Sequence, residues 1–168
     1  MDLLIPQTFE RLANEALSKE RGLIHRWEGS SLRRRRLVLP RQCEDGFEVA
    51  AVAETYGLYA FAEGWHSGAW DTPGLTPESL VVDFLGFLRT LLSPDARLDV
   101  HYAGRTRSKW IMHYRDESGW QADTTGVLIF NYFGKRTVVT LQNTVLPPRY
   151  AETGAVQQRD EADEAREG

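Results

Sequence analysis

Asp99, His101 and His113 come closest, by residue type and spacing, to a catalytic arrangement in this sequence. They fall in two stretches of alternating polarity, 97–103 and 108–115, and this alternation is typical of half-buried strands. If the apolar positions of both stretches share one face, the register that pairs Val100 with Met112 places Asp99 directly opposite His113. His101 then lies one diagonal step from His113.

An Asp–His pair can orient an imidazole as a general base, and two His with one Asp could bind a metal ion. However, the sequence places no nucleophile beside the pair, and the spacing matches no known metal motif. Charged pairs across neighbouring strands also stabilise ordinary sheets. The cluster therefore predicts either a weak catalytic or ligand site, or simple sheet stabilisation.

The stretch 64–75 is the densest in residues that could bind a partner: Trp65, His66, Trp70 and Asp71 lie there among glycines. Ser67 completes a nominal Ser–His–Asp set, but neighbouring residues rarely face one another and the glycine pattern of a nucleophile elbow is missing. A long loop with two Trp either packs on the core or serves as a binding surface. We expect at least one exposed indole here.

Four consecutive arginines, Arg33 to Arg36, form the most conspicuous charged run. Arg34 and Arg36 would share one face of a strand and could contact phosphate. The alternative is a solvated edge strand whose charges discourage edge-to-edge pairing. No aromatic residues are interleaved with the arginines, and the net charge of −4 gives no general attraction for nucleic acid. Nucleic-acid binding is therefore the weaker interpretation.

Composition and motifs argue against several other classes of protein, namely disulfide-bonded, cofactor-dependent, metal-dependent and secreted ones. The single cysteine, Cys43, has acidic neighbours that disfavour a thiolate, and it excludes an intramolecular disulfide. No phosphate loop, dinucleotide fingerprint or zinc-protease motif is present, so we expect no cofactor and no metal. The first residues lack the basic and apolar regions of a signal peptide, which predicts a cytoplasmic protein.

The elements that must position these residues are organised around an apolar helix over 76–92. Thr76 is a good N-cap, Pro77 suits the first turn, and the polar residues form only a thin strip, so the helix should be buried on most sides. Gly86 should admit a close neighbour. A first amphipathic helix is expected over 6–20.

Strands are expected on both sides of the central helix. The first half predicts them over 23–28, 32–39, 47–54 and 58–63, and the second half over 97–103, 108–115, 120–124, 127–133 and 136–142. Five alanines in 47–63 suggest that a helix packs closely on that hairpin. The order helix, about four strands, helix, about five strands predicts an α+β fold with mainly antiparallel pairing.

The sequence predicts one domain over 1–150 and a disordered acidic tail over 151–168, which carries two basic and six acidic residues. A helix followed by a strand meander also occurs in secretion-chaperone-like and other adaptor folds, a likeness of fold order alone. We therefore expect a non-catalytic protein-binding module of adaptor, chaperone or immunity type, with another protein as partner, no membrane, and a homodimer as one option. The alternatives are a small enzyme or ligand-binding domain using the His/Asp cluster, and a nucleic-acid binder using the arginines.

Overall fold

The computed structural model describes residues 5–29, 31, 33–126 and 134–150, and these form an α+β fold of two helices and two antiparallel sheets. The predicted fold class and element order are confirmed. The first half contains α1 (Ile5–Leu17), β1 (Arg26–Glu28), β2 (Arg34–Leu39), β3 (Val49–Glu54), β4 (Gly57–Ala62) and β5 (Trp65–His66). The second half contains α2 (Pro77–Leu91), β6 (Ala96–Ala103), β7 (Thr106–Asp116), β8 (Gly119–Gly126) and β9 (Arg136–Leu141).

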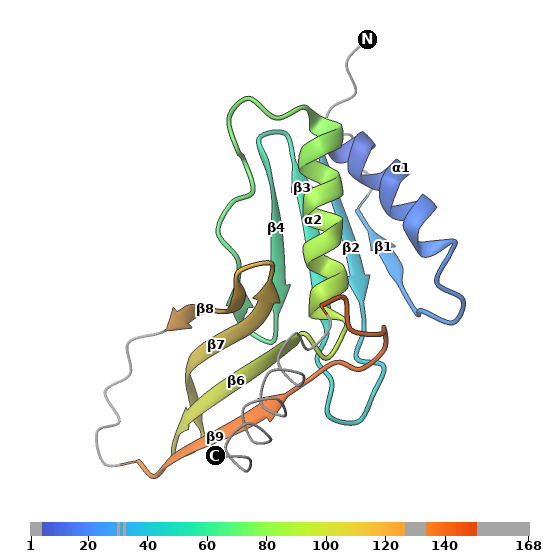
Figure 1. Cartoon of the computed structure of the whole chain (residues 1–168). Helices are drawn as coiled ribbons and strands as arrows, with labels where there is room; N and C mark the ends of the chain where they lie inside the picture. The colour runs from blue at the N-terminus through green and yellow to red at the C-terminus, as the bar shows by residue number, and fades with distance from the viewer. Residues whose placement is uncertain (1–4, 30, 32, 127–133, 151–168) are drawn as a thin grey trace, which may run out of the picture.

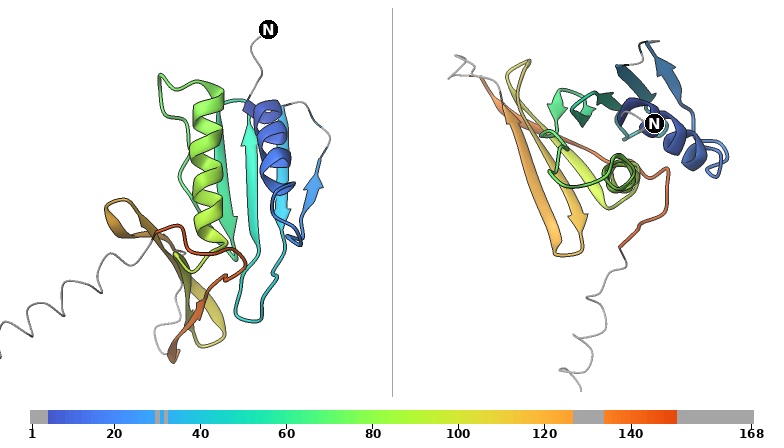
Figure 2. Two further views of the ribbon diagram at one scale, coloured as in Figure 1. Left: turned by 45° about the vertical axis from the view of Figure 1, so that its right-hand side comes forward. Right: turned by 90° about the horizontal axis from the view of Figure 1, so that it is seen from above.

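The two sheets have different connectivity. Strands β1 to β5 form one sheet in sequence order, whereas the other sheet has the order β8-β7-β6-β9. Both helices cover one face of the first sheet (Figure 1), and α2 lies in the angle between the two sheets when viewed from above (Figure 2). Because α2 touches strands of both sheets, it is the element around which the core is assembled.

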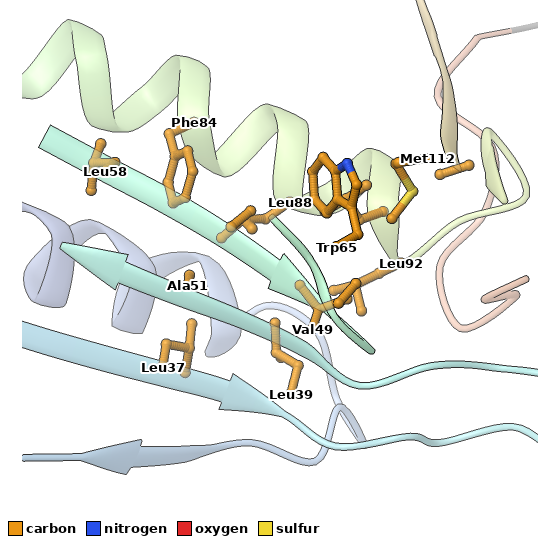
Figure 3. Close-up of a cluster of buried hydrophobic side chains, with 14 of the residues drawn as sticks. Leu37, Leu39, Val49, Ala51, Leu58, Trp65, Phe84, Leu88, Leu92 and Met112 are labelled. Carbon is orange, nitrogen blue, oxygen red and sulfur yellow. The ribbon is translucent and has the colours of Figure 1, made fainter. Parts of the chain in front are cut away.

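Helix α2 forms as its sequence predicts. The Thr76 side chain accepts a hydrogen bond from the Ser79 backbone N–H, and Pro77 occupies the first turn. Phe84 and Leu88 are buried against Leu58 of β4 and their neighbours (Figure 3). The expected close neighbour of Gly86 is the guanidinium of Arg149, since a Cβ there would lie 2.7 Å from its Nη1.

The alanine-rich hairpin of β3 and β4 is confirmed, with Glu54 paired to Gly57 across a two-residue turn. Its inward-facing alanines are buried in the core beneath the helices, and they are Ala51, Ala53, Ala60 and Ala62. Small side chains let the helix backbone approach the sheet, which explains why poor strand formers occupy these positions.

The predicted register of β6 and β7 is wrong by two residues. Asp99 pairs with Ile111, not with His113, and Val100 pairs with Trp110. The strands continue to a tight turn at Gly104-Arg105, where Gly104 has φ +63°, and a bulge between His101 and Tyr102 shifts the remaining pairs. Turn length fixes register, and a shift of two residues leaves the faces unchanged.

Several other boundaries differ from expectation. The predicted loop 64–75 contains β5, and Trp70 forms an isolated bridge with Leu58. Strand β2 lies between β1 and β3, but β1 pairs only with the residues from Arg36 to Val38. The edge-strand alternative is therefore wrong for Arg36, whereas Arg34 and Arg35 extend beyond the pairing with β1. The predicted strand over 127–133 and the predicted tail over 151–168 lie outside the described residues.

Residues 143–150 hold the far end of α2. The buried Asn143 side chain donates to the Phe47 and Leu91 carbonyls and accepts from the Phe47 N–H. Asp95 accepts hydrogen bonds from the backbone N–H groups of Arg149 and Tyr150. These contacts fix the segment against α2, where it contributes to a groove described below.

Candidate functional site

The tryptophan loop packs on the core, contrary to the expectation of an exposed indole. Trp65 is 1% exposed and lies near Leu88, Leu92 and Met112 (Figure 3), while Trp70 is half-buried against Phe84. The indoles point toward the core because the loop returns to pair with β4. Gly64, which has φ +123° and no side chain, lets the Trp110 ring lie against the backbone.

The nominal Ser–His–Asp set does not assemble. The Ser67 hydroxyl is buried, accepts from the Ala60 N–H and donates to the Gly68 carbonyl, so it closes the loop. His66 is exposed, and its Nδ1 lies 3.3 Å from the Ser67 carbonyl. Asp71 is exposed at the end of the loop. These contacts are structural, and none of them activates a hydroxyl as a nucleophile.

The inward packing of the loop creates a pocket of about 190 Å³ beside α2, which we call the aromatic pocket. Its lining consists of Trp65, Ser67, Gly68, Ala69, Trp70, Thr72, Phe87, Tyr114 and Asp123. The Phe87 ring is the centre of the array, with centroids 5.3 Å from Trp70, 5.2 Å from Tyr114 and 6.4 Å from Trp65. The sequence indicated Trp65 and Trp70 as binding residues but missed Phe87, Tyr114 and Asp123.

Asp123 supplies the negative charge of the aromatic pocket. Its Oδ2 accepts a 3.2 Å hydrogen bond from the Trp65 indole N–H, and it forms no ion pair within the described part of the chain. Burial raises the pKa of Tyr114, and the negative charges of Asp123 and Asp116 raise that pKa further. The pocket therefore contains a neutral phenol and a carboxylate that has no cationic partner among the described residues.

The Asp99–His113 pair does form, although through a different register than predicted. The two residues are diagonal neighbours, and His113 Nε2 lies 3.0 Å from Asp99 Oδ2. Thr140 of β9 donates to the other carboxylate oxygen at 2.6 Å. Because the threonine hydroxyl is bonded to Asp99 and not to the imidazole, this set ties β6, β7 and β9 together, and no nucleophile of the described residues is hydrogen-bonded to His113.

His101 does not join this pair. It is opposite Lys109 in the register, and its Nε2 is buried without a hydrogen-bond partner among the described residues. In the same part of the chain, no group of three His, Cys, Asp or Glu side chains could hold a metal ion. The residues expected to form one cluster are thus divided into a bonded pair and a separate histidine, and neither lines the two pockets described here.

Three residues of the arginine run, Arg34 to Arg36, form ion pairs with acidic partners on the two faces of β2. Arg35 contacts Glu10 of α1 at 2.7 Å, while on the other face Arg36 contacts Glu28 at 2.8 Å. Arg34 lies 3.4 Å from Glu54 of β3. Because these guanidinium groups are already paired within the sheet and with α1, their arrangement favours a structural role over phosphate contact.

Cys43 is also accounted for by local packing. Its sulfur lies 3.7 Å from the Gln142 carbonyl and 3.9 Å from Asn143 Oδ1, where the loop before β3 meets the last described segment. Both neighbours are oxygen atoms, so the thiol packs against hydrogen-bond acceptors where these two segments meet. The interpretation of Cys43 as a structural thiol agrees with these contacts.

A second and larger cavity, which the sequence reasoning missed, lies between α1 and α2. This helix groove has a volume of about 480 Å³ and is floored by Leu37 and Leu39 of β2. Its other apolar residues are Ala13, Ala16, Leu17, Leu23, Val82, Leu85, Leu88, Leu92 and Leu146. Among the described residues that line it, none is a His, Cys, Ser, Thr or Tyr, and the surface of the groove is mainly aliphatic.

Charged residues occur only at the rim of the helix groove. They are Lys19, Glu20, Arg89 and Arg149, and Glu20 is bound to Arg89 at 2.7 Å. The rim therefore carries an excess of positive charge. A sequence signal for the groove existed: α2 has apolar residues on nearly every side, more than one core face can cover, and Val82 is left 56% exposed.

Comparisons with known proteins add no information about the site, because no family model, curated protein or solved structure matches this chain. Within the described residues, neither helix is long and apolar enough to cross a membrane.

Proposed function

We propose that this protein is a non-catalytic binding module of adaptor type whose helix groove holds a short aliphatic segment of a partner protein. The single observation that carries the proposal is the groove itself, which is open, about 480 Å³ in volume and lined by aliphatic side chains. Volumes of about 300–1,000 Å³ are usual for ligand sites. The lone cysteine fits a reducing compartment, so the proposal places the protein in the cytoplasm.

Charge at the rim selects the flanks of that segment. Lys19 and Arg149 have no acidic partner among the described residues, whereas Glu20 is already paired with Arg89. An acidic residue beside the aliphatic segment would therefore meet positive charge on entry. Leucine side chains suit the groove because the lining offers no buried polar group that would have to be satisfied.

The proposal is tested with two fluorescent peptides that share a core of leucine and alanine, one flanked by aspartates and the other by lysines. We expect the aspartate-flanked peptide to bind more tightly, and Val82→Lys to weaken its binding about tenfold, since a charge would be desolvated in an apolar site. The matched control is Val138→Lys on β9, where Val138 is 51% exposed and outside the groove.

Two results would contradict the proposal. Equal changes in peptide affinity for Val82→Lys and Val138→Lys, whether both strengthen or both weaken it, would show that the peptide does not bind in the groove. Saturable binding of dodecanoate without binding of either peptide would replace a protein segment with a lipid. Dimerisation of the free protein in sedimentation experiments that Val82→Lys abolishes and Val138→Lys retains would instead make a second copy of this chain the occupant of the groove.

A further inference from the structure

We infer that the aromatic pocket is a second, independent binding site that accepts the ammonium group of an organic cation. The pocket lies on the other side of α2 from the helix groove and shares no lining residue with it. It combines aromatic rings from three different elements with one carboxylate. Those two features together select positive charge and exclude anions.

The aromatic rings approach the pocket from several directions. The rings of Trp65, Trp70 and Tyr114 each pack against Phe87, with planes inclined to its plane by 50°, 34° and 85°. Trp65 is buried, and the half-buried rings of Trp70, Phe87 and Tyr114 reach the pocket in different orientations. An ammonium group is attracted electrostatically to aromatic faces, and more strongly where the site is desolvated. Rings in several orientations suit a cation with methyl groups on all sides.

Asp123 supplies the complementary charge. It is half-buried, its partner is the neutral indole of Trp65, and within the described chain no cationic side chain pairs with it. A neutral apolar ligand would cover this carboxylate without replacing its lost hydration, whereas an ammonium group compensates for it.

The size of the pocket limits the ligand to a head group. A volume of about 190 Å³ is below the range of about 300–1,000 Å³ that holds a drug-sized molecule. A methylated ammonium group fits this description, either as part of a free amine or at the end of a lysine side chain from a partner. Both sources present the same chemistry to the pocket.

The test uses the wild-type protein and two probes of the same shape. Choline carries a positive charge, and 3,3-dimethylbutan-1-ol is its neutral isostere. The indole N–H signals of Trp65 and Trp70 are followed by NMR during titration. We expect choline to shift both signals with a Kd on the order of 1 mM, and the neutral isostere to bind about tenfold more weakly. Equal affinity for the two probes, or no shift with choline, would overturn the inference.

Paired variants locate the charge. Asp123→Asn retains an oxygen that accepts the Trp65 indole N–H, so the fold should be kept while choline binding weakens about tenfold. Asp71→Asn removes the same charge from the exposed end of the loop, outside the pocket lining, and should change the affinity less than about twofold. Equal effects of the two substitutions would mean diffuse attraction and would contradict a built site.

A third probe, the acetylated methylamide of trimethyllysine, assigns the source of the cation. Tighter binding than choline supports a partner's lysine side chain, and binding no tighter than choline supports a free amine. Both results support an ammonium site. Loss of choline binding with retained peptide binding in the helix groove would overturn this inference alone, because the two sites share no lining residue.

Discussion

The helix groove and the aromatic pocket lie on opposite sides of α2 and offer different chemistry. The groove is aliphatic, about 480 Å³ in volume and positive at its rim, whereas the pocket is aromatic, about 190 Å³ and negative at Asp123. One helix serves both because Val82 and Leu85 face α1, while Phe87 faces β7 and the tryptophan loop. The comparison indicates that an excess of apolar residues on a central helix can mark two sites instead of one large core.

The largest effect on stability is expected at Phe84, which lies between the two sites. Its ring centroid is 6.0 Å from that of Phe9 and 5.6 Å from that of Trp70. Phe84→Ala should destabilise the protein by about 3–5 kcal/mol, through lost burial and the cavity left behind. Urea unfolding measures the loss. Val82→Ala on the exposed side of the same helix is the control and should cost less than about 1 kcal/mol.

If the two substitutions cost the same, α2 is rotated relative to the structure described, and the division of its surface into two sites fails. If Phe84→Ala folds at low temperature, both peptide and choline binding should weaken together, because the residue supports the walls of both sites.

An intermediate effect on stability is expected at Asn143, which supports the helix groove but not the aromatic pocket. Asn143→Ala leaves the buried N–H and carbonyl of Phe47 and the carbonyl of Leu91 without partners, which should cost about 3 kcal/mol. Because Leu146 and Arg149 follow it, peptide binding in the helix groove should weaken while choline binding is retained. Thr144→Ala, on an exposed neighbour, is the control in the same thermal and binding measurements.

The sequence predicts the scaffold of both sites better than the sites themselves. Local signals, such as the Thr76 cap and the alanines of β3 and β4, act within a few residues and appear in the structure as expected. The register of β6 and β7 depends on one tight turn and one bulge, and alternation alone cannot distinguish shifts of two residues.

The aromatic pocket depends on contacts across long stretches of sequence. Trp65 and Asp123 are 58 residues apart, and Phe87 lies between them on a different element. The two tryptophans were identified from composition, but a loop that can face solvent or the core carries no local sign of its direction. The same reason separates His101 from His113: both histidines were identified, but the two-residue shift of register places His113 opposite Arg97 and His101 opposite Lys109, so the two imidazoles are no longer diagonal neighbours.

The smallest effect, and the sharpest test of the pocket's electrostatics, concerns Tyr114 at high pH. Burial, then Asp123 and Asp116, raise the pKa of Tyr114 above its ordinary value of 10.0. The folded protein therefore keeps the phenol proton at pH values where the unfolded chain releases it. The stability that the neutral phenol contributes is fully present below about pH 10 and is lost as pH rises through the folded pKa.

Tyr114→Phe should remove this pH-dependent loss of stability, since phenylalanine has no proton to release. The free energy of unfolding, measured by urea titration between about pH 9 and pH 12, should fall less steeply for Tyr114→Phe than for the wild type. Tyr56→Phe is the matched control, because Tyr56 is 86% exposed, and its profile should follow the wild type. If Tyr114→Phe leaves the profile unchanged, as Tyr56→Phe should, then Tyr114 titrates like an exposed tyrosine, and the aromatic pocket lacks the low-polarity, negatively charged surroundings that distinguish it from the helix groove.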